Sequence, residues 1–472
     1  MTAATLPAAR SRYIALLVAG AFFMENLDAT VIVTALPDMA RSFNAAAVDV
    51  NIGITAYVLT LAVFIPASGW VAERWGHRRV FMAALAVFIL ASILCGISQT
   101  LWQFVAARVL QGIGGAMMVP VGRLVVLRNT EKSDLLKAIA LITWPGLVAP
   151  VLGPPLGGFV TTYASWHWIF LLNVPLGLLA LAFAWKLMPE RAAEQAPGAF
   201  DRRGFVLSAL ACGGLLYGLE HLGQAPREWP AYLLLAASAG LVLLLARHLR
   251  RHPAPLLRLD ALNIPTYAVT FKGGSLFRAM VSAHPFLLPL MFQLGFGYDA
   301  VTAGLMVLTL FAGNIGMKPM TGWVLRRYGF RNTLIGSGSV LTLCTFACAT
   351  MTPDTPWAVL LPVLLVSGMA RSMGFTAYSS LAFADMPKPL MASANTLFSM
   401  TQQLAFGLGI ALAVIFLRAS EALLGAAAND LAAYHVAFAL VGVLTLASML
   451  DLRRLPREAG AHVSGHILPK AP

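Results

Sequence analysis

Two stretches of this chain match without gaps: Gly69-Trp-Val-Ala-Glu-Arg-Trp-Gly-His-Arg78 and Gly322-Trp-Val-Leu-Arg-Arg-Tyr-Gly-Phe-Arg331. They agree at six of ten positions, and each joins two apolar segments. Glycine and arginine are common in such loops, but the shared Trp-Val pair and the matching position favour an internal duplication. The repeat predicts two related halves, an architecture that many transporters use to expose one central site to either side of a membrane.

Apolar segments follow one another along the whole chain. Of its 472 residues, 59% are hydrophobic and 11% are charged, against about 25% charged residues in a soluble domain. Each segment has about 18 or more residues, enough to cross a hydrocarbon core of about 30 Å. The first segment follows Arg10 and Arg12 and runs to Leu36 without a small-residue cleavage site, so we interpret it as a retained helix.

We predict an all-α membrane protein with fourteen transmembrane helices. They are expected at about 13–36, 47–68, 79–98, 102–127, 137–163, 166–186, 204–220, 230–247, 267–292, 301–322, 332–350, 357–379, 391–417 and 432–451. The middle pair is interpreted as an insertion between two six-helix bundles. The expected organisation is an amino-terminal bundle at 1–190, the inserted helices and linkers at 191–260, a carboxy-terminal bundle at 261–455 and a cytoplasmic tail at 456–472.

The distribution of basic residues predicts the orientation in the membrane. Loops on the side of the amino terminus carry 24 of the 33 Lys and Arg residues, whereas the opposite loops carry Arg41, Arg227 and Arg418. Because cytoplasmic loops are enriched in Lys and Arg, both termini are expected in the cytoplasm. The net charge of +13 is then explained by topology and by anionic lipid headgroups, rather than by nucleic acid.

Other classes of protein find little support in the sequence. The four cysteines lie inside apolar segments without a CxxC pair. We find no nucleophile–base pair or metal constellation, so we expect neither an enzyme nor a metal site. Because no GxxxxGK[ST] loop is present, we expect no cofactor and an ion gradient as the source of energy. A monomer is expected, and the sequence assigns no periplasmic adaptor.

The first copy of the repeat resembles the loop signature of the major facilitator superfamily, in the residues Gly69, Glu73, Arg74, Gly76 and Arg78. The resemblance implies the major facilitator fold, and it implies that this loop forms a cytoplasmic gate. In the family, the acid of the loop faces the amino terminus of a helix, where a negative charge is favoured. Arg326 takes the place of the acid in the second copy, so we expect an asymmetric gate.

Further segments narrow the resemblance to the EmrB/QacA group of fourteen-helix drug–proton antiporters. Leu27-Asp-Ala-Thr-Val-Ile-Val-Thr-Ala-Leu-Pro37 is similar to the helix 1 signature of that group, and Arg108-Val-Leu-Gln-Gly-Ile-Gly-Gly115 to the helix 4 motif of the family. Met117-Met-Val-Pro-Val-Gly-Arg123 and Ala164-Ser-Trp-His-Trp-Ile-Phe170 resemble MdtD-type members. The resemblance implies proton-coupled multidrug efflux across the bacterial inner membrane by alternating access.

Two acidic residues, Glu25 and Asp28, lie deep in the first segment. An ionisable group at membrane depth is costly, about 2.5–3.5 kcal/mol on insertion scales, so it is a functional candidate that needs a partner. At 1.5 Å per residue, Asp28 and Arg108 reach the same depth from opposite sides of the membrane. We therefore predict that Asp28 is the principal proton site, with Arg108 as its partner and Glu25 as a second candidate for proton coupling. A purely structural Asp28–Arg108 ion pair is the alternative.

The fifth segment is rich in proline and glycine, including Gly153-Pro-Pro-Leu-Gly-Gly158. It resembles the antiporter motif of helix 5, which implies a bent, tightly packed helix that seals the halves and opposes leak. The residues carried over are Pro150, Gly153, Pro154, Gly157 and Gly158.

The other charged residues in the apolar segments are basic. Arg123 and Lys318 lie near the cytoplasmic ends and are expected to extend to the membrane surface. A substrate cavity is predicted at Arg278, Arg371, Lys272, Gln293 and Gln402. Because guanidinium groups pair with carboxylates, an exporter of organic anions or metal-chelating carboxylates is the alternative to a multidrug exporter. Packing roles for Arg278 and Arg371 also remain open, and a proton-coupled importer is a less favoured third function.

Overall fold

The structure is a computed structural model that describes residues 8–45, 47–190, 198–224, 229–425 and 430–466, without the side chains at positions 8, 9, 33, 47, 48, 145–147, 150, 154, 223, 224 and 300. Every regular element within these residues is a helix. The first half contains α1 (Ala8–Val31), α2 (Leu36–Phe43), α3 (Ala47–Phe64), α4 (Ser68–Trp75), α5 (His77–Gly96), α6 (Leu101–Asn129), α7 (Leu135–Tyr163), α8 (His167–Leu171) and α9 (Asn173–Leu187). The inserted pair is α10 (Arg202–Gln224) and α11 (Trp229–Arg251).

The second half contains α12 (Pro265–Leu290), α13 (Ala300–Gly316), α14 (Lys318–Cys348), α15 (Trp357–Ala384), α16 (Met391–Leu424), α17 (Leu431–Ala447) and the short α18 (Ala461–Ser464). In the described part of the chain, eleven helices are long and apolar enough to cross a membrane, or up to twelve if α13 and α14, bent by 52°, form one span. The all-α class and a multi-pass membrane protein are thereby confirmed. The count of fourteen stays a prediction.

The two copies of the repeated stretch share an unusual backbone conformation. Gly76, between α4 and α5, has φ 87°, and Gly329, at a kink inside α14, has φ 70°. Residues with a side chain rarely adopt this region, whereas glycine enters it freely. The same break between two helical segments therefore occurs at the same position of both copies, which supports the duplication.

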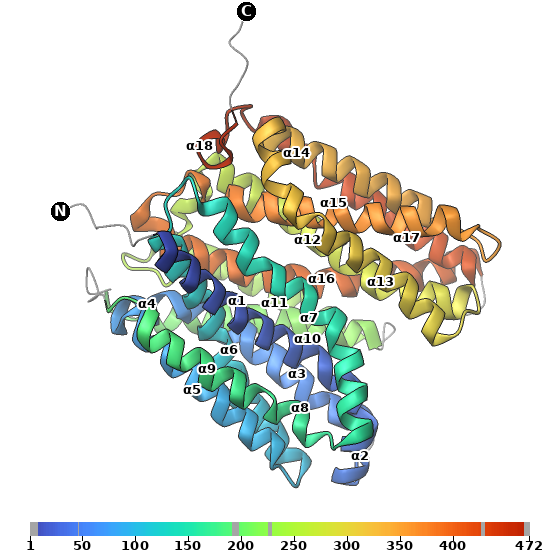
Figure 1. Ribbon diagram of the computed structural model, residues 1–472, viewed down its shortest axis with the longest axis horizontal. Helices are drawn as coiled ribbons and strands as arrows, with labels where there is room; N and C mark the ends of the chain where they lie inside the picture. The colour runs from blue at the N-terminus through green and yellow to red at the C-terminus, as the bar shows by residue number, and fades with distance from the viewer. Residues whose placement is uncertain (1–7, 46, 191–197, 225–228, 426–429, 467–472) are drawn as a thin grey trace, which may run out of the picture.

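The two halves pack side by side, with blue-to-green helices on one side of the molecule and yellow-to-red helices on the other (Figure 1). One hydrophobic core joins α1, α3, α5 and α6, and another joins α12, α13, α15 and α17. The inserted α10 packs against α3 of the first half and α16 of the second. The start of α1 and the short α18 lie at the same end of the bundle, which we call the terminal end.

Asp201 holds the inserted pair together at the terminal end. Its carboxylate accepts hydrogen bonds from the backbone N–H of Gly204, in the first turn of α10, and of Leu256, after α11. The His248 side chain, on the last turns of α11, binds the same carboxylate. Burial acts to raise the pKa of Asp201, but these hydrogen bonds outweigh it and hold that pKa below its usual value.

The described part of the expected tail at 456–472 is packed against the second half. Val463 in α18 is buried, and the His462 ring lies 3.0 Å from the backbone oxygen of Ala384 at the end of α15. His466 contacts the backbone oxygen of Arg326, within the second copy of the repeat. Residues 467–472 lie outside the described residues. The carboxy-terminal segment thus covers the second copy of the repeat.

Candidate functional site

A buried ion pair lies in the core of the first half. The Arg108 Nη1 on α6 donates to Asp28 Oδ2 on α1 at 2.5 Å. Asp28 is 1% exposed and Arg108 is fully buried. The depth argument from the sequence therefore paired the correct residues, although their role in coupling stays a prediction.

Two amides complete the coordination of the Asp28 carboxylate. The side-chain amide of Gln111 donates to Oδ1 at 2.9 Å, and that of Asn173 at 2.8 Å. Ser92 on α5 accepts from the Gln111 amide at 2.9 Å. Charge-assisted hydrogen bonds of this kind are about twice as strong as neutral ones. The carboxylate is consequently bound by side chains from α6 and α9.

The guanidinium of Arg108 is held on its other side by α3. It lies 4.2 Å from the centre of the Tyr57 ring, and its Nε donates to the backbone oxygen of Gly53 at 3.4 Å. A cation over an aromatic face gains about 2 kcal/mol when both are removed from water. One side chain thus connects α6 to α1 and α3.

Glu25 lies near this pair but is less well bound. It shares α1 with Asp28, and its carboxyl carbon would lie 3.8 Å from a methyl group added at Gly115 on α6. Its Oε2 is buried and has no hydrogen-bond partner. Both Arg123 and Asp28 act on it electrostatically. The two acids therefore differ, because both oxygens of Asp28 accept hydrogen bonds whereas Glu25 has a buried oxygen without a donor.

Sequence reasoning missed Gln111, Asn173, Ser92 and Tyr57. Gln111 was detectable in part, because it lies three residues after Arg108 and so shares its helix face. Asn173 begins α9 after the short helix α8, and nothing in its neighbourhood indicated that it would reach α1.

The predicted gate residues take three different roles. Glu73 binds Arg128, at the end of α6, with 3.1 Å between Oε1 and Nη2. This partner is a cation within the same half, rather than the helix amino terminus that the resemblance implied. Arg78 donates to the backbone oxygen of Trp185 on α9 at 2.7 Å, and Arg74 is exposed.

Gly69 is the gate residue that faces the other half. A methyl group added there would lie 2.5 Å from Thr396 Oγ1 on α16. Nearby, the Asn395 amide donates to the backbone oxygen of Pro120 on α6 at 2.8 Å. The helices α4 and α6 of the first half therefore touch α16 of the second close to the terminal end.

Two basic side chains also join the halves, contrary to the expectation that they extend to the membrane surface. Arg123 is only 7% exposed and donates to Ser399 on α16 at 3.3 Å. Lys318 donates to Thr143 on α7 at 3.2 Å and to Thr376 on α15 at 2.7 Å. The expectation was wrong for Arg123, which is buried against Ser399, and Lys318 is bound by hydroxyl groups of two neighbouring helices.

The helix with the predicted antiporter motif is α7, which packs along α1. A methyl group at Gly153 would collide with Thr30, and one at Gly157 with Thr34 and with the backbone oxygen of Val31. Gly158 has open space around it. The side chains of Pro150 and Pro154 lie outside the described residues. Tight packing is therefore found at two of the three glycines, against the helix that carries Asp28.

The five residues predicted to line a substrate cavity do not form one group. Arg278 and Arg371 are 1% and 5% exposed. The guanidinium carbon of Arg278 lies 4.4 Å from the centre of the Phe398 ring, and that of Arg123 lies 5.1 Å from the same ring. Gln402 lines a small pocket beside Phe398 and Arg123. Lys272 and Gln293 are exposed, whereas the two arginines are buried.

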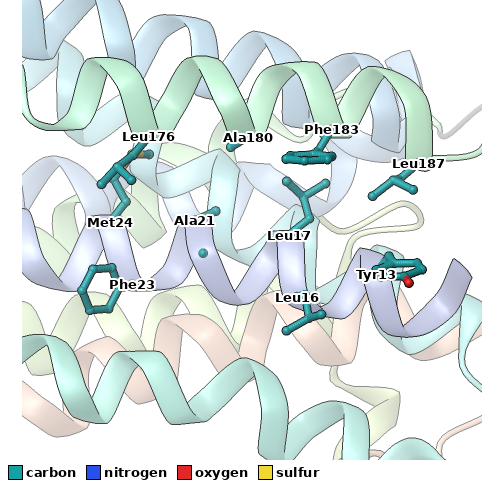
Figure 2. Close-up of a pocket in the computed structure, with 11 residues that line it drawn as sticks. Tyr13, Leu16, Leu17, Ala21, Phe23, Met24, Leu176, Ala180, Phe183 and Leu187 are labelled. Carbon is teal, nitrogen blue, oxygen red and sulfur yellow. The ribbon is translucent and has the colours of Figure 1, made fainter. Parts of the chain in front are cut away.

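An apolar groove of about 500 Å³ lies between α1 and α9 (Figure 2). Leu17 and Met24 of α1 face Leu176 and Phe183 of α9 across it, with Tyr13 at one end. Its lining offers hydrocarbon and no charge, as expected of a surface turned toward lipid tails. We therefore place the candidate functional site at the buried charges and not in this groove.

The fold agrees with comparisons to known proteins. A family model described as "Major Facilitator Superfamily" matches residues 18–410. The chain belongs to the major facilitator superfamily. It is therefore a multi-pass membrane transporter, and the family resemblance drawn from the sequence is confirmed.

Relatives named "Putative multidrug resistance protein MdtD" are similar over most of their length. The one from Pectobacterium atrosepticum is 40% identical over 85% of this chain and 86% of the relative. That from Salmonella typhimurium is 38% identical over 85% of both chains. These relatives confirm the resemblance to MdtD-type members.

Solved structures of this superfamily share the fold. The human organic anion transporter MFSD10 (TETRAN) has a TM-score of 0.68 at 16% identity, covering 95% of this chain and all of that one. The proton:xylose symporter XylE has a TM-score of 0.68 at 14% identity, covering 96% and 98%. At these identities the likeness concerns the fold alone.

Replacing Gly157 by Ala is expected to destabilise the protein, whereas replacing the adjacent Gly158 by Ala is not. The added methyl group collides with α1 at the first position and meets open space at the second. Overpacking of this kind costs about 1–3 kcal/mol. Thermal unfolding of both variants in detergent measures the difference, and equal midpoints would contradict the tight α1–α7 contact.

Proposed function

We propose that this transporter exports small molecules, including drugs, across the bacterial inner membrane in exchange for protons. The observation that carries the proposal is the buried Asp28–Arg108 pair with Glu25 beside it. Burying two carboxyl groups in the core of a membrane bundle costs free energy. Proton exchange is a function that requires such groups and would explain their presence. The multidrug resistance named in the relatives favours drug export.

We propose fourteen spans with both termini in the cytoplasm. The eleven long apolar helices of the described residues do not include α7, α13 or α14. With α7 as one span and the α13–α14 segment as two, divided at the Gly329 kink, the count becomes fourteen. The terminal end then carries the basic loops, and Lys and Arg are enriched in cytoplasmic loops. The sequence prediction of the orientation therefore stands as part of this proposal.

Proton coupling is proposed to use the two acids differently. A proton on Asp28 has to compete with the charged hydrogen bond of Arg108 at Oδ2 or with the two amides at Oδ1. The Oε2 of Glu25 can take up a proton without breaking a hydrogen bond. Protonation of Glu25 would also remove its repulsion of Asp28 and its attraction to Arg123. Because Arg123 binds Ser399 in the other half, a change in the charge of Glu25 acts on a contact between the halves.

Alternating access is proposed to break and remake the contacts at the terminal end. Arg123–Ser399, Asn395–Pro120 and Lys318–Thr143 join the halves there. Each is a hydrogen bond between two helices, worth about 0.5–3 kcal/mol depending on charge. Contacts of this size can hold one state and still be exchanged during transport.

Replacing Glu25 by Gln is expected to abolish the dependence of export on a pH gradient, because the amide cannot exchange a proton in this range. Efflux from proteoliposomes with an imposed gradient measures it. The matched control is Glu220→Gln on α10, where the carboxyl accepts a hydrogen bond from Thr55; this variant should keep the gradient dependence.

Asp28→Asn tests how much the buried ion pair contributes to the stability of the fold. It leaves Arg108 buried without a counter-charge, which costs about 3–5 kcal/mol, so its thermal stability is measured alongside transport. For the Glu25→Gln variant, export that depends on the pH gradient as in the wild type would refute the coupling role of Glu25. A wild-type protein that ignores the gradient would refute proton antiport itself.

Export of organic anions is a second candidate function, favoured by the unpartnered guanidinium groups of the second half. Nε and Nη2 of Arg278, and Nε and Nη1 of Arg371, are buried without hydrogen-bond partners. A carboxylate substrate would supply acceptors and the missing negative charge. Arg123 adds a positive charge at the Phe398 ring, where Arg278 also lies, whereas Arg371 lies over Phe311.

If anions are the substrates, replacing Arg278 and Arg371 each by Gln should weaken anion transport by roughly ten- to a hundredfold, the value of a charged hydrogen bond. The assay compares citrate-like anions with ethidium-like cations in the same proteoliposomes. Arg418→Gln is the control, since Arg418 is exposed and pairs with Glu421. Transport of cations alone, or anion transport that survives both substitutions, would exclude this candidate.

A further inference from the structure

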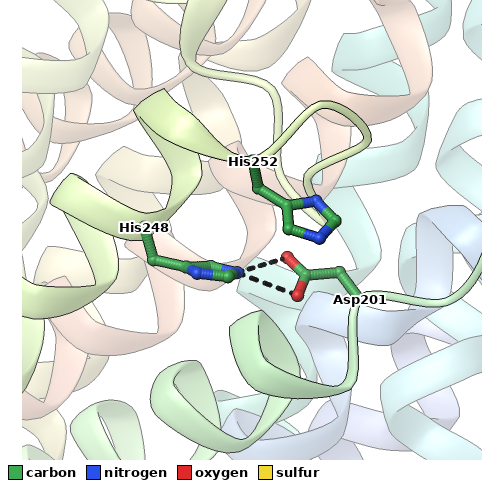
Figure 3. A group of neighbouring side chains, drawn as sticks. All are labelled: Asp201, His248 and His252. Carbon is green, nitrogen blue, oxygen red and sulfur yellow. Dashed lines mark hydrogen bonds and ion pairs between the residues drawn. The ribbon is translucent and has the colours of Figure 1, made fainter.

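A cluster of two histidines and an aspartate lies at the terminal end of the inserted helices, away from the buried charges of the transport core. Asp201 precedes α10, His248 lies near the end of α11, and His252 follows that helix directly. One ligand atom of each lies within 4.8 Å of the others. Figure 3 shows both rings turned toward the Asp201 carboxylate.

We propose that Asp201, His248 and His252 form a binding site for a divalent transition metal such as Zn²⁺. The two histidines are four residues apart, the spacing that places them on one face of a helix and one of the common spacings of zinc ligands. Imidazole and carboxylate are ligands that Zn²⁺ accepts, and three protein ligands leave one position for water. No metal site was expected from the sequence, in which Asp201 lies 47 residues before His248.

Two of the three ligands already lie close to the spacing that the ion needs. His248 Nε2 lies 2.9 and 3.0 Å from the two oxygens of Asp201. Metal–ligand bonds of about 2.0–2.2 Å in a tetrahedron place the ligand atoms about 3.4 Å apart. The rings of His248 and His252 are 5.0 Å apart between centres. To hold an ion, His248 and Asp201 would move apart by about half an ångström, whereas the His252 ligand atom, within 4.8 Å of theirs, would close to about 3.4 Å.

The surroundings fix the carboxylate and leave the histidines accessible. Asp201 is held by two backbone N–H groups, which orient a ligand in the manner of outer-shell hydrogen bonds in metal sites. The Nδ1 of His252 accepts a long 3.3 Å hydrogen bond from the N–H of Ala254. Binding a metal through Nε2 moves the ring proton to Nδ1, so this weak bond is given up.

The position of the site connects it to the gate. Phe200, next to Asp201, stacks edge-on against Trp70 with 4.9 Å between ring centres. The indole N–H of Trp70 donates to the backbone oxygen of Gly198 at 3.0 Å. Trp70 follows Gly69, which touches α16 of the other half. A metal on Asp201 would therefore anchor the segment 198–201 that packs on the gate helix α4.

The test uses the purified full-length protein without a histidine tag, stripped of metal by a chelator. Titration with Co²⁺ should give the visible absorption of a tetrahedral site at one ion per chain, and Zn²⁺ should displace it. Replacing His252 by Asn should weaken Co²⁺ binding more than about tenfold, since changes in even the outer shell of a metal site cost that much.

The variants separate a metal site from a simple ion pair. His252→Asn leaves the Asp201–His248 hydrogen bonds in place, so a loss of Co²⁺ binding cannot be ascribed to breaking them. The control is His462→Asn, at another His–Asp pair with 3.7 Å between His462 and Asp385; Co²⁺ binding should be unchanged there. No tetrahedral absorption, or the same affinity in the His252 variant as in the wild type, would overturn the proposal. These readouts do not depend on transport, so they are independent of the proposed proton exchange.

Discussion

The ion pair between Asp28 and Arg108 is the interaction on which the first half depends. Two opposite charges are buried among apolar helices, where leaving either one alone would be strongly destabilising. Their hydrogen bonds reach Gln111, Asn173 and Gly53, so α1, α3, α6 and α9 are held in one arrangement. Close packing of α7 on α1 at Gly153 and Gly157 supports the same helix from its other side.

The duplicated halves share their backbone pattern but differ in charge. Both copies of the repeat break at a glycine with positive φ, yet Glu73 of the first copy corresponds to Arg326 of the second. The deep acids lie in the first half, whereas Arg278 and Arg371 lie buried in the second. The backbone of each half has to fit the packing of the whole bundle, whereas the sign of a charge has to fit only the side chains around it. The halves were therefore free to specialise, one for protons and one for substrate in the proposed function.

The inserted helices contribute more than two additional spans. Through α10 they touch both halves, and through Phe200 they pack on Trp70 beside the gate. A ligand that fixes Asp201 would therefore also fix the segment that packs on Trp70, beside the predicted gate. Such a connection would let a ligand at the terminal end influence a transporter whose core lies in the membrane.

The sequence by itself determined the class of fold, the duplication and the pairing of Asp28 with Arg108. Span length and charge position give the depth of a residue along a helix axis, because each residue adds a fixed 1.5 Å. The depth of Asp28 and of Arg108 was enough to predict their pairing, because each buried charge needs a partner. Gly76 and Gly329, at the same position of the two copies, mark the break between two helical segments in each half.

Only the tertiary structure decided which way each side chain faces. A membrane helix is apolar nearly all round, so its hydrophobic pattern does not mark the face that packs inward. Hence Asn173 was not expected at Asp28, Arg123 was expected at the surface rather than against Ser399, and Lys272 was placed with Arg278 although it is exposed. Asp201 and the two histidines lie far apart in the sequence and meet only because α10 and α11 pack as an antiparallel pair.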